Sequence, residues 1–212
     1  GAEASRVRLD IDPLNREEQL DHILASGADL GIYSDVPTGE SDDTVAVSNI
    51  AVQLPSRDVG TLDGAQADFD QRFKTLEQIR NQGASATEVK RAVSAVKRAN
   101  QRLNLVKASE AWTHDGHIEL NVQSMRIGQT VLVSLPVEPF AELGNDVKKH
   151  SNAVNTIFSG FSNGHFKYLP TDIAYEEGGY EVRVCVFEPG SADLAVRASL
   201  EAIDEVVNHF KQ

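Results

Sequence analysis

A run of six almost wholly apolar residues, Thr130–Leu135, is the feature that most constrains how this chain folds. The turn dipeptide Gly128–Gln129 precedes the run and Pro136 follows it, so the run has the length of a single strand. Strands without polar alternation are typical of sheets that are covered on both faces. We therefore expect Thr130–Leu135 to be a buried strand.

Several other segments have strand character. In two of them, residues 45–54 and 118–127, apolar side chains alternate but the phase changes near Asn49 and near Ser124. We expect a β-bulge near Ser124, because one extra residue in a strand shifts the alternation. The remaining expected strands are Val7–Ile11, Ile157–Phe158 and Tyr180–Phe187.

Helices are predicted between these strands. Phe69, Phe73, Leu76 and Ile79 recur at helical spacing before Gly83, and Ser85 with Glu88 forms a capping box that opens a second helix. The short connection predicts an antiparallel helical hairpin over residues 64–107. Further helices are expected at residues 14–25, 140–147 and 196–210. The sequence therefore predicts a single α/β (α+β) domain over residues 1–212, with a mixed sheet, flanking helices and the inserted hairpin.

Charge limits the partners of the chain. Its 32 acidic residues against 20 Lys and Arg give a net charge of −12. Phosphate backbones and anionic membrane surfaces attract concentrated positive charge, so we expect neither nucleic acid nor such a surface as a partner. No apolar run reaches the roughly 20 residues of a spanning helix, so we expect no transmembrane segment. The single cysteine, Cys185, excludes an internal disulfide.

Glu138 is the first candidate functional residue. It follows the buried strand and precedes a helix, and ligand sites collect where strands of open sheets end. Pro136 and Pro139 flank it and restrict the backbone on both sides. The alternative is that Glu138 only interacts with the N-terminus of the following helix.

A polar and aromatic loop, residues 160–171, is the second candidate. His165 and Tyr168 are three residues apart within it, and Tyr175 to Glu181 follow closely. A tyrosine hydroxyl can donate a hydrogen bond to a developing oxyanion, and a phenolate can bind a metal. The alternative is a turn whose aromatic side chains cover the edge of the sheet.

Several separated motifs occur in a recognisable order. They are Ile127–Gly128, Leu135–Phe140, Gly160–Asn163, Tyr168, Pro170–Thr171 and Tyr175–Glu181. From about Val45 to Phe210, the chain resembles the C-terminal part of the catalytic domain of neutral/alkaline (non-lysosomal) ceramidases. The resemblance implies a zinc-dependent hydrolase of lipid amides such as N-acyl sphingoid bases. It also implies a secreted or periplasmic protein.

The resemblance assigns roles to individual residues. It implies that Glu138 and Tyr168 are zinc ligands and that Tyr180 donates a hydrogen bond near the reacting carbonyl. His165 replaces the first tyrosine of the family signature and is taken as a further catalytic candidate. Val137 stands where the family has glycine, and Gly179 where ceramidases have arginine. These departures make the chain more similar to the uncharacterised bacterial relatives than to the ceramidases themselves.

The remaining ligands of the zinc site would have to come from outside this chain. The two histidine ligands and the serine nucleophile of the family lie in an N-terminal half that this chain does not contain. We therefore expect that half, or a partner subunit, to complete the site, and an exposed apolar patch beside it. His114 and His117 have ligand spacing, but we expect them in a solvated turn at the opposite end of the sheet from Glu138.

The sequence leaves two alternative hypotheses for the function of the chain. The chain is part of a zinc amide hydrolase that acts on a lipid amide, or it is a non-catalytic module of the same fold. In the second case, the helical hairpin of residues 64–107 would be its interaction surface.

Overall fold

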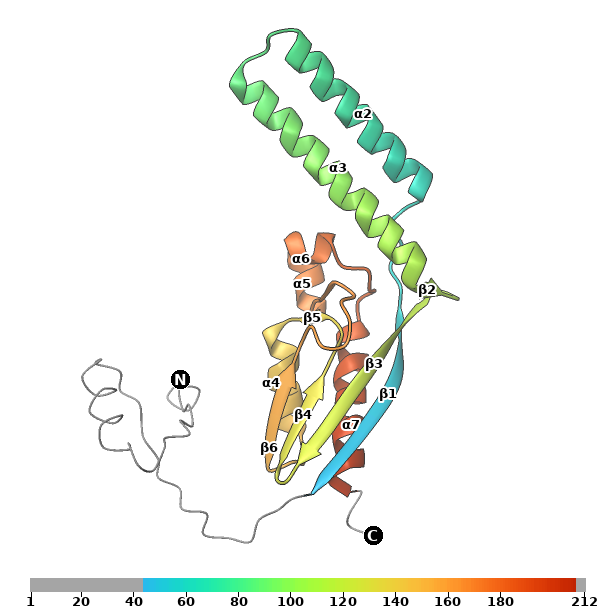
Figure 1. Cartoon of the computed structure of the whole chain (residues 1–212), viewed down its shortest axis with the longest axis vertical. Coiled ribbons are helices and arrows are strands. Elements are labelled where there is room, and N and C mark those ends of the chain that lie inside the picture. The colour runs from blue at the N-terminus through green and yellow to red at the C-terminus, as the bar shows by residue number, and fades with distance from the viewer. Residues whose placement is uncertain (1–43, 209–212) are drawn as a thin grey trace, which may run out of the picture. The chain divides into compact units, whose positions relative to one another are not determined.

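The computed structural model describes residues 44–208, which belong to a compact unit that spans Asp42–Gln212. The expected strand Val7–Ile11 and the expected helix of residues 14–25 lie outside the described residues. The described part is a mixed α/β structure, as the sequence predicts (Figure 1).

A mixed sheet forms the centre of this unit. Its main strands are β1 (Val45–Pro55), β3 (His117–Ile127), β4 (Thr130–Ser134) and β6 (Asn155–Ser159), in the order β1-β3-β4-β6. Strand β3 is antiparallel to both β1 and β4, and the Gly128–Gln129 turn joins β3 to β4 as predicted. Strands β4 and β6 are parallel, with α4 (Ala141–His150) between them in the chain.

One face of the sheet is covered by α7 (Ser191–Asn208) and by α4 (Figure 1). The core lies between these helices and the inward-facing strand residues, which include Leu54, Leu120 and Val133. The buried side of α7 is mostly small residues, namely Ala192, Ala195, Ala198, Ser199 and Ala202, with Ile203 and Val206. Small side chains allow the helix backbone to approach the sheet closely, so the larger Val196, Leu200 and Val207 lie only half-buried at the margin.

Two details of the sequence-based strand prediction are wrong. Strand β1 alternates without a phase change near Asn49, and β3 continues through Ser124 in unbroken register with both neighbours, so there is no bulge. Ser48 and Ser124 occupy inward positions in place of apolar residues. The apolar residues that suggested a change of phase, such as Val47 and Met125, lie on the opposite face of the sheet.

The predicted helical hairpin is formed by α2 (Leu62–Asn81) and α3 (Ala86–Trp112), which pack against each other (Figure 1). Gly83 takes a positive φ of 68° just after α2, where a glycine C-cap is expected. Ser85 and Glu88 make the predicted capping box. At the base of the hairpin, Trp112 packs edge-to-face on Phe166 with 5.0 Å between ring centroids. No described helix is long and apolar enough to cross a membrane.

The two histidines after α3 lie in a tight turn, as predicted. His114 belongs to β2 (Thr113–His114) and pairs with His117 across Asp115 and Gly116, and both histidines are exposed. Their expected place at the opposite end from Glu138 is wrong. Because β3 and β4 are antiparallel, the His117 end of β3 points the same way as the end of β4 that leads to Glu138.

The segment after the sheet differs most from prediction. Residues 180–187 are not a strand: α6 (Tyr180–Arg183) is a short helix, and Ser56 forms an isolated bridge with Phe187. The alternating valines suggested a strand, but Gly178 and Gly179 reverse the chain with positive φ, and the Val184 amide donates to the Tyr180 carbonyl. A short α5 (Asp172–Glu177) precedes it.

Candidate functional site

Glu138 and Tyr168 are brought together by the backbone. β5 (Glu138–Pro139) and β7 (Tyr168–Leu169) form a separate two-stranded parallel sheet in which Glu138 is the direct partner of Tyr168. Glu138 does not cap α4, because the N-cap is Phe140 and no side chain makes a capping hydrogen bond there. Glu138 therefore makes no capping hydrogen bond to α4.

Backbone hydrogen bonds hold the segments on either side of this ladder. The Phe161 amide donates to the Val137 carbonyl at 2.8 Å, and the Phe166 amide donates to the Pro136 carbonyl at 2.8 Å. The Glu138 amide donates in the other direction, to the Lys167 carbonyl at 2.9 Å. Residues 160–167 thus wrap around residues 135–138 and fix the position of Glu138.

The wrapping loop includes unfavourable backbone conformations. Phe161, Asn163 and Lys167 have positive φ values of 53°, 61° and 67°. Such conformations cost about 1 kcal/mol or more for residues with a β-carbon. Val137, by contrast, does not adopt a positive φ, so this turn does not require the glycine that the ceramidase signature has there.

The pKa of the Tyr168 phenol is raised above its ordinary value, and the largest cause is hydrogen bonding to the neighbouring Glu138 carboxylate. Partial burial and the negative charge of Glu138 raise the pKa further, with smaller contributions from Tyr180 and Glu181. The raised pKa keeps the Tyr168 phenol protonated at neutral pH beside the Glu138 carboxylate.

Tyr180 lies beside this pair although it comes from α6. Its ring meets the Tyr168 ring edge-to-face, with 6.1 Å between centroids, and 45% of its surface is exposed. Three chain segments, around residues 138, 168 and 180, thus meet in one cluster that solvent reaches. Their roles as metal ligands and as a hydrogen-bond donor stay predictions.

His165 is exposed and stacks on Phe161, with 5.1 Å between ring centroids. It belongs to the loop that holds Glu138, because the Phe161 amide donates to the Val137 carbonyl. The structure shows a ring contact between His165 and Phe161. The catalytic role of His165 stays a prediction.

Glu181 is a member of the cluster that the sequence reasoning did not single out. Its charge contributes to the raised pKa of Tyr168, so it lies within electrostatic reach of the Glu138–Tyr168 pair. Its place directly after Tyr180 was visible in the sequence, but only the helical conformation of residues 180–183 brings it near Tyr168.

The fit of this cluster to zinc is partial. Glu138 and Tyr168 offer two oxygen donors, whereas a catalytic zinc usually has three protein ligands and one open position. Within residues 44–208, no group of three or more His, Cys, Asp and Glu side chains is arranged to hold a metal ion.

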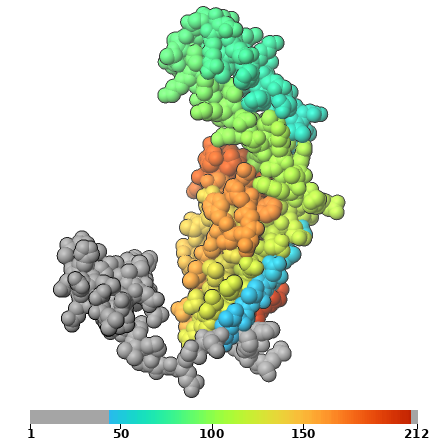
Figure 2. All heavy atoms as spheres, in the orientation of Figure 1, coloured from blue at the N-terminus to red at the C-terminus, as the bar shows by residue number. Residues whose placement is uncertain are grey.

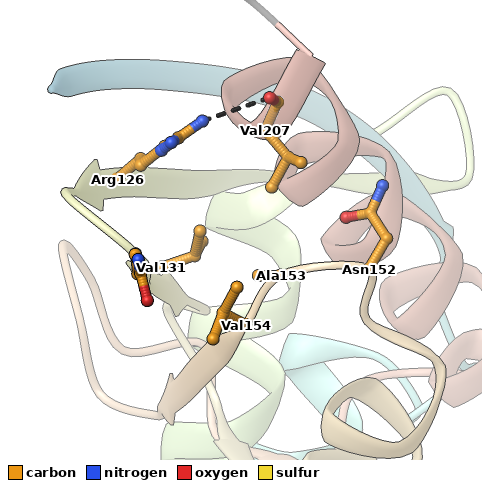
Figure 3. Close-up of a pocket in the computed structure, with 7 residues that line it drawn as sticks. Arg126, Val131, Asn152, Ala153, Val154 and Val207 are labelled. Atoms are coloured by element: carbon orange, nitrogen blue, oxygen red, sulfur yellow. Dashed lines mark hydrogen bonds between the residues drawn. The ribbon is translucent and has the colours of Figure 1, made fainter. Parts of the chain in front are cut away.

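A cavity of about 330 Å³ lies at the other end of the sheet, next to the β3–β4 turn (Figure 3). Arg126 lines it and donates hydrogen bonds to the Gly128 carbonyl at 2.7 Å and to the Val207 carbonyl at 3.2 Å. A cation beside the C-terminal carbonyls of α7 stabilises that helix end. The guanidinium thus serves the fold here, well separated along β4 from Glu138.

Comparison with known proteins gives partial structural similarity. Solved structures similar to the chain include a ceramidase complexed with C2, at 19% identity and a TM-score of 0.40, and the neutral ceramidase from Pseudomonas aeruginosa, at 20% and 0.36. Each alignment covers 43% of this chain and 15% of the other chain, so this chain spans a small part of their length. No protein-family model and no curated protein sequence matches. The assignment of roles therefore rests on the residues of this chain.

Proposed function

We propose that this chain supplies part of the metal and substrate site of an amide hydrolase similar to neutral ceramidase. The observation that carries the proposal is the meeting of Glu138, Tyr168 and Tyr180 from three separate chain segments. The motif resemblance assigned a shared site to these same residues without any information on their distances. A lipid amide, such as an N-acyl sphingoid base, is the proposed substrate class.

Glu138 and Tyr168 would hold the zinc ion in this proposal. The phenol is protonated at neutral pH because its pKa is raised, so a cation that binds its oxygen has to displace that proton. Bound zinc would polarise the amide carbonyl and activate a nucleophile. The chain's own contribution is to hold two oxygen donors at a spacing that the β5–β7 ladder fixes.

Tyr180 is proposed to donate its hydroxyl proton in a hydrogen bond to the carbonyl oxygen as negative charge develops there. An aligned donor of this kind favours the transition state over the ground state. The edge-to-face contact with Tyr168 orients the Tyr180 ring, and its partial exposure leaves room for a substrate. His165 is proposed as a proton carrier at the rim of the site, because it is exposed and belongs to the loop that holds Glu138.

Further ligands and the nucleophile would come from outside the described residues, in the missing half of the domain or in a partner subunit. Two oxygen donors, one of which must first lose a proton, give weak binding. We therefore expect the chain alone to bind zinc weakly and not to hydrolyse N-acyl sphingosines.

Zinc titration of the full chain, followed by NMR of labelled tyrosine rings and by calorimetry, tests the proposal. We expect weak binding that shifts the Tyr168 and Tyr180 signals, releases a proton, and is lost in Glu138→Gln and in Tyr168→Phe. Glu119→Gln is the matched control, because Glu119 is an exposed carboxylate on the sheet that accepts a hydrogen bond from Gln53.

Tight zinc binding that is lost on substitution of His114 and His117 would contradict the proposal. Zinc binding that leaves both tyrosine signals unchanged would contradict it as well. Supplying a polypeptide with the histidine ligands and the serine should then give a tight site and amide hydrolysis. Tight binding without hydrolysis would favour the non-catalytic module instead.

A further inference from the structure

The face of the sheet opposite α4 and α7 carries a continuous apolar row. Val47 pairs with Met125, Met125 with Leu132, and Leu132 with Ile157, so the row crosses all four main strands. Val47, Leu132 and Ile157 are 57%, 38% and 53% exposed. Val45 and Ile127, each 60% exposed, extend the patch by one row. We call these six residues the open apolar face.

The row of Val47 is apolar across all four main strands, whereas the row of Val45 and Ile127 continues into the polar Thr130 and Asn155. The next row towards the candidate site is polar and uncharged, with Asn49, Gln123 and Ser134, and the Asn163 side chain of the wrapping loop donates to Gln123 at 2.8 Å. That loop therefore contacts the polar row. Figure 2 shows the strands at the surface on this side.

The sequence pattern at this end of the sheet is that of strands buried on both faces. Along β3, Val122 is fully buried on the helix side, while Met125 and Ile127 lie on the outer side. Single exposed apolar residues are common, but six adjoining ones in register indicate a contact surface.

We propose that the open apolar face is the contact surface between two copies of this chain. A twofold-symmetric contact places the same patch on both sides, so the patch has to be complementary to itself. An uncharged apolar patch can meet that requirement, and paired sheets pack face to face about 10 Å apart.

Charge favours a second copy at this face. The chain carries a net charge of −12, so most of its surfaces repel a second copy. Across the rows of the open apolar face and the polar row beside it, the outward side chains are uncharged, and the first outward charge along β3 is Glu119. Two copies thus approach through this face without bringing like charges together.

The size of the face sets the strength of the association. Four strands about 4.8 Å apart span about 14 Å, and two rows along the strands cover about as much, so the face is on the order of 200 Å². That is well below the ~800 Å² that each partner contributes to a standard interface. We therefore expect a weak dimer that forms in the micromolar range and is strengthened by salt, since salt screens the net repulsion.

Sedimentation equilibrium of the full chain over a range of concentrations tests the proposal. We expect a monomer–dimer equilibrium that Leu132→Glu shifts to monomer, because the substitution puts two carboxylates at the centre of the contact. Phe73→Glu is the matched control: Phe73 is 46% exposed on α2, so the same change there should leave the dimer unchanged. Val47→Glu serves if circular dichroism shows that Leu132→Glu misfolds.

A mixture of two variants with opposite charges at residue 132 gives the decisive measurement. Leu132→Glu and Leu132→Lys chains should each be monomeric, and an equal mixture should recover the dimer. A chain that stays monomeric at every concentration would show that something else occupies this face and would overturn the proposal. Open-ended polymers, which would indicate pairing through the edge of β1, would overturn it too, as would a dimer that survives Leu132→Glu.

Discussion

Tyr168 lies directly opposite Glu138 in a parallel ladder of two residues on each strand, and hydrogen bonding to the Glu138 carboxylate is the largest cause of the raised pKa of the Tyr168 phenol. The bond stabilises the protonated phenol and raises its pKa above the ordinary value near 10. We expect Glu138→Gln to lower the pKa of Tyr168 towards that value, because it removes the charge. An NMR titration of labelled tyrosine rings measures the change, and Tyr175 serves as an internal control.

The partly buried phenol of Tyr175 should make the free energy of unfolding fall at alkaline pH. Its hydroxyl donates to the Phe187 carbonyl at 2.8 Å and contacts the Cys185 sulfur at 3.3 Å, and burial raises the pKa of Tyr175 strongly. A folded-state pKa raised above the unfolded value gives a contribution that is full below about pH 10 and is lost as pH rises further. Chemical denaturation as a function of pH should show this loss.

Tyr175→Phe separates the two effects of that hydroxyl. At neutral pH we expect the free energy of unfolding to fall by about 1 kcal/mol, because the hydrogen bond to the Phe187 carbonyl is lost. Above pH 10 the variant should lose less stability than the original chain, since it has no phenol to ionise there. Parallel pH profiles of the two proteins would contradict this account.

Gly160 is expected to be intolerant of any side chain. A β-carbon there would lie 2.6 Å from Cδ of Pro139 and 3.1 Å from the carbonyl oxygen of Val137. We expect Gly160→Ala to destabilise the fold by about 1–3 kcal/mol, as overpacking does, and to disturb the Tyr168 signal. Gly83→Ala is the control: it strains a positive φ in open space on the hairpin and should leave Tyr168 unchanged.

The capping box makes a prediction that is local to the hairpin. The Glu88 amide donates to the Ser85 hydroxyl, and the Ser85 amide donates to the Glu88 carboxylate at 2.9 Å. We expect Ser85→Ala to speed amide exchange at the start of α3 and to leave exchange in β3 unchanged. The hydrogen bonds from Ser85 lower the pKa of Glu88, so their stabilisation is present at neutral pH and is lost on acidification.

Much of the fold follows from local sequence signals. The hairpin was predictable because Gly83, Ser85 and Glu88 mark the end of one helix and the start of the next. The position of strand β4 was predictable from its composition, but the expectation that it is buried on both faces is wrong at Leu132, which is 38% exposed. The segment Tyr180–Phe187 was not predictable, because local backbone reversal at Gly178 and Gly179 outweighs the alternation of its valines.

The candidate site could be predicted only in part from the sequence. The family motif drew attention to Glu138, Tyr168 and Tyr180, but their contacts depend on pairing between distant segments, which no local pattern encodes. Strand phase was misread for a related reason. Val47 and Met125 looked like breaks in alternation, because a sequence does not distinguish a shifted strand from one with apolar residues on both faces.

Because residues 160–167 wrap around residues 135–138, we expect that the side chains at positions 138 and 168 can be substituted with little effect on the backbone. Its position is set by main-chain hydrogen bonds, so we expect substitution of either side chain to leave the two Cα atoms at the same separation. We therefore expect the two positions to act as a socket that accepts other donor pairs, histidine or carboxylate, without rebuilding the loop. For an engineer, such a socket is a place to install a ligand pair, because the supporting backbone already holds the geometry.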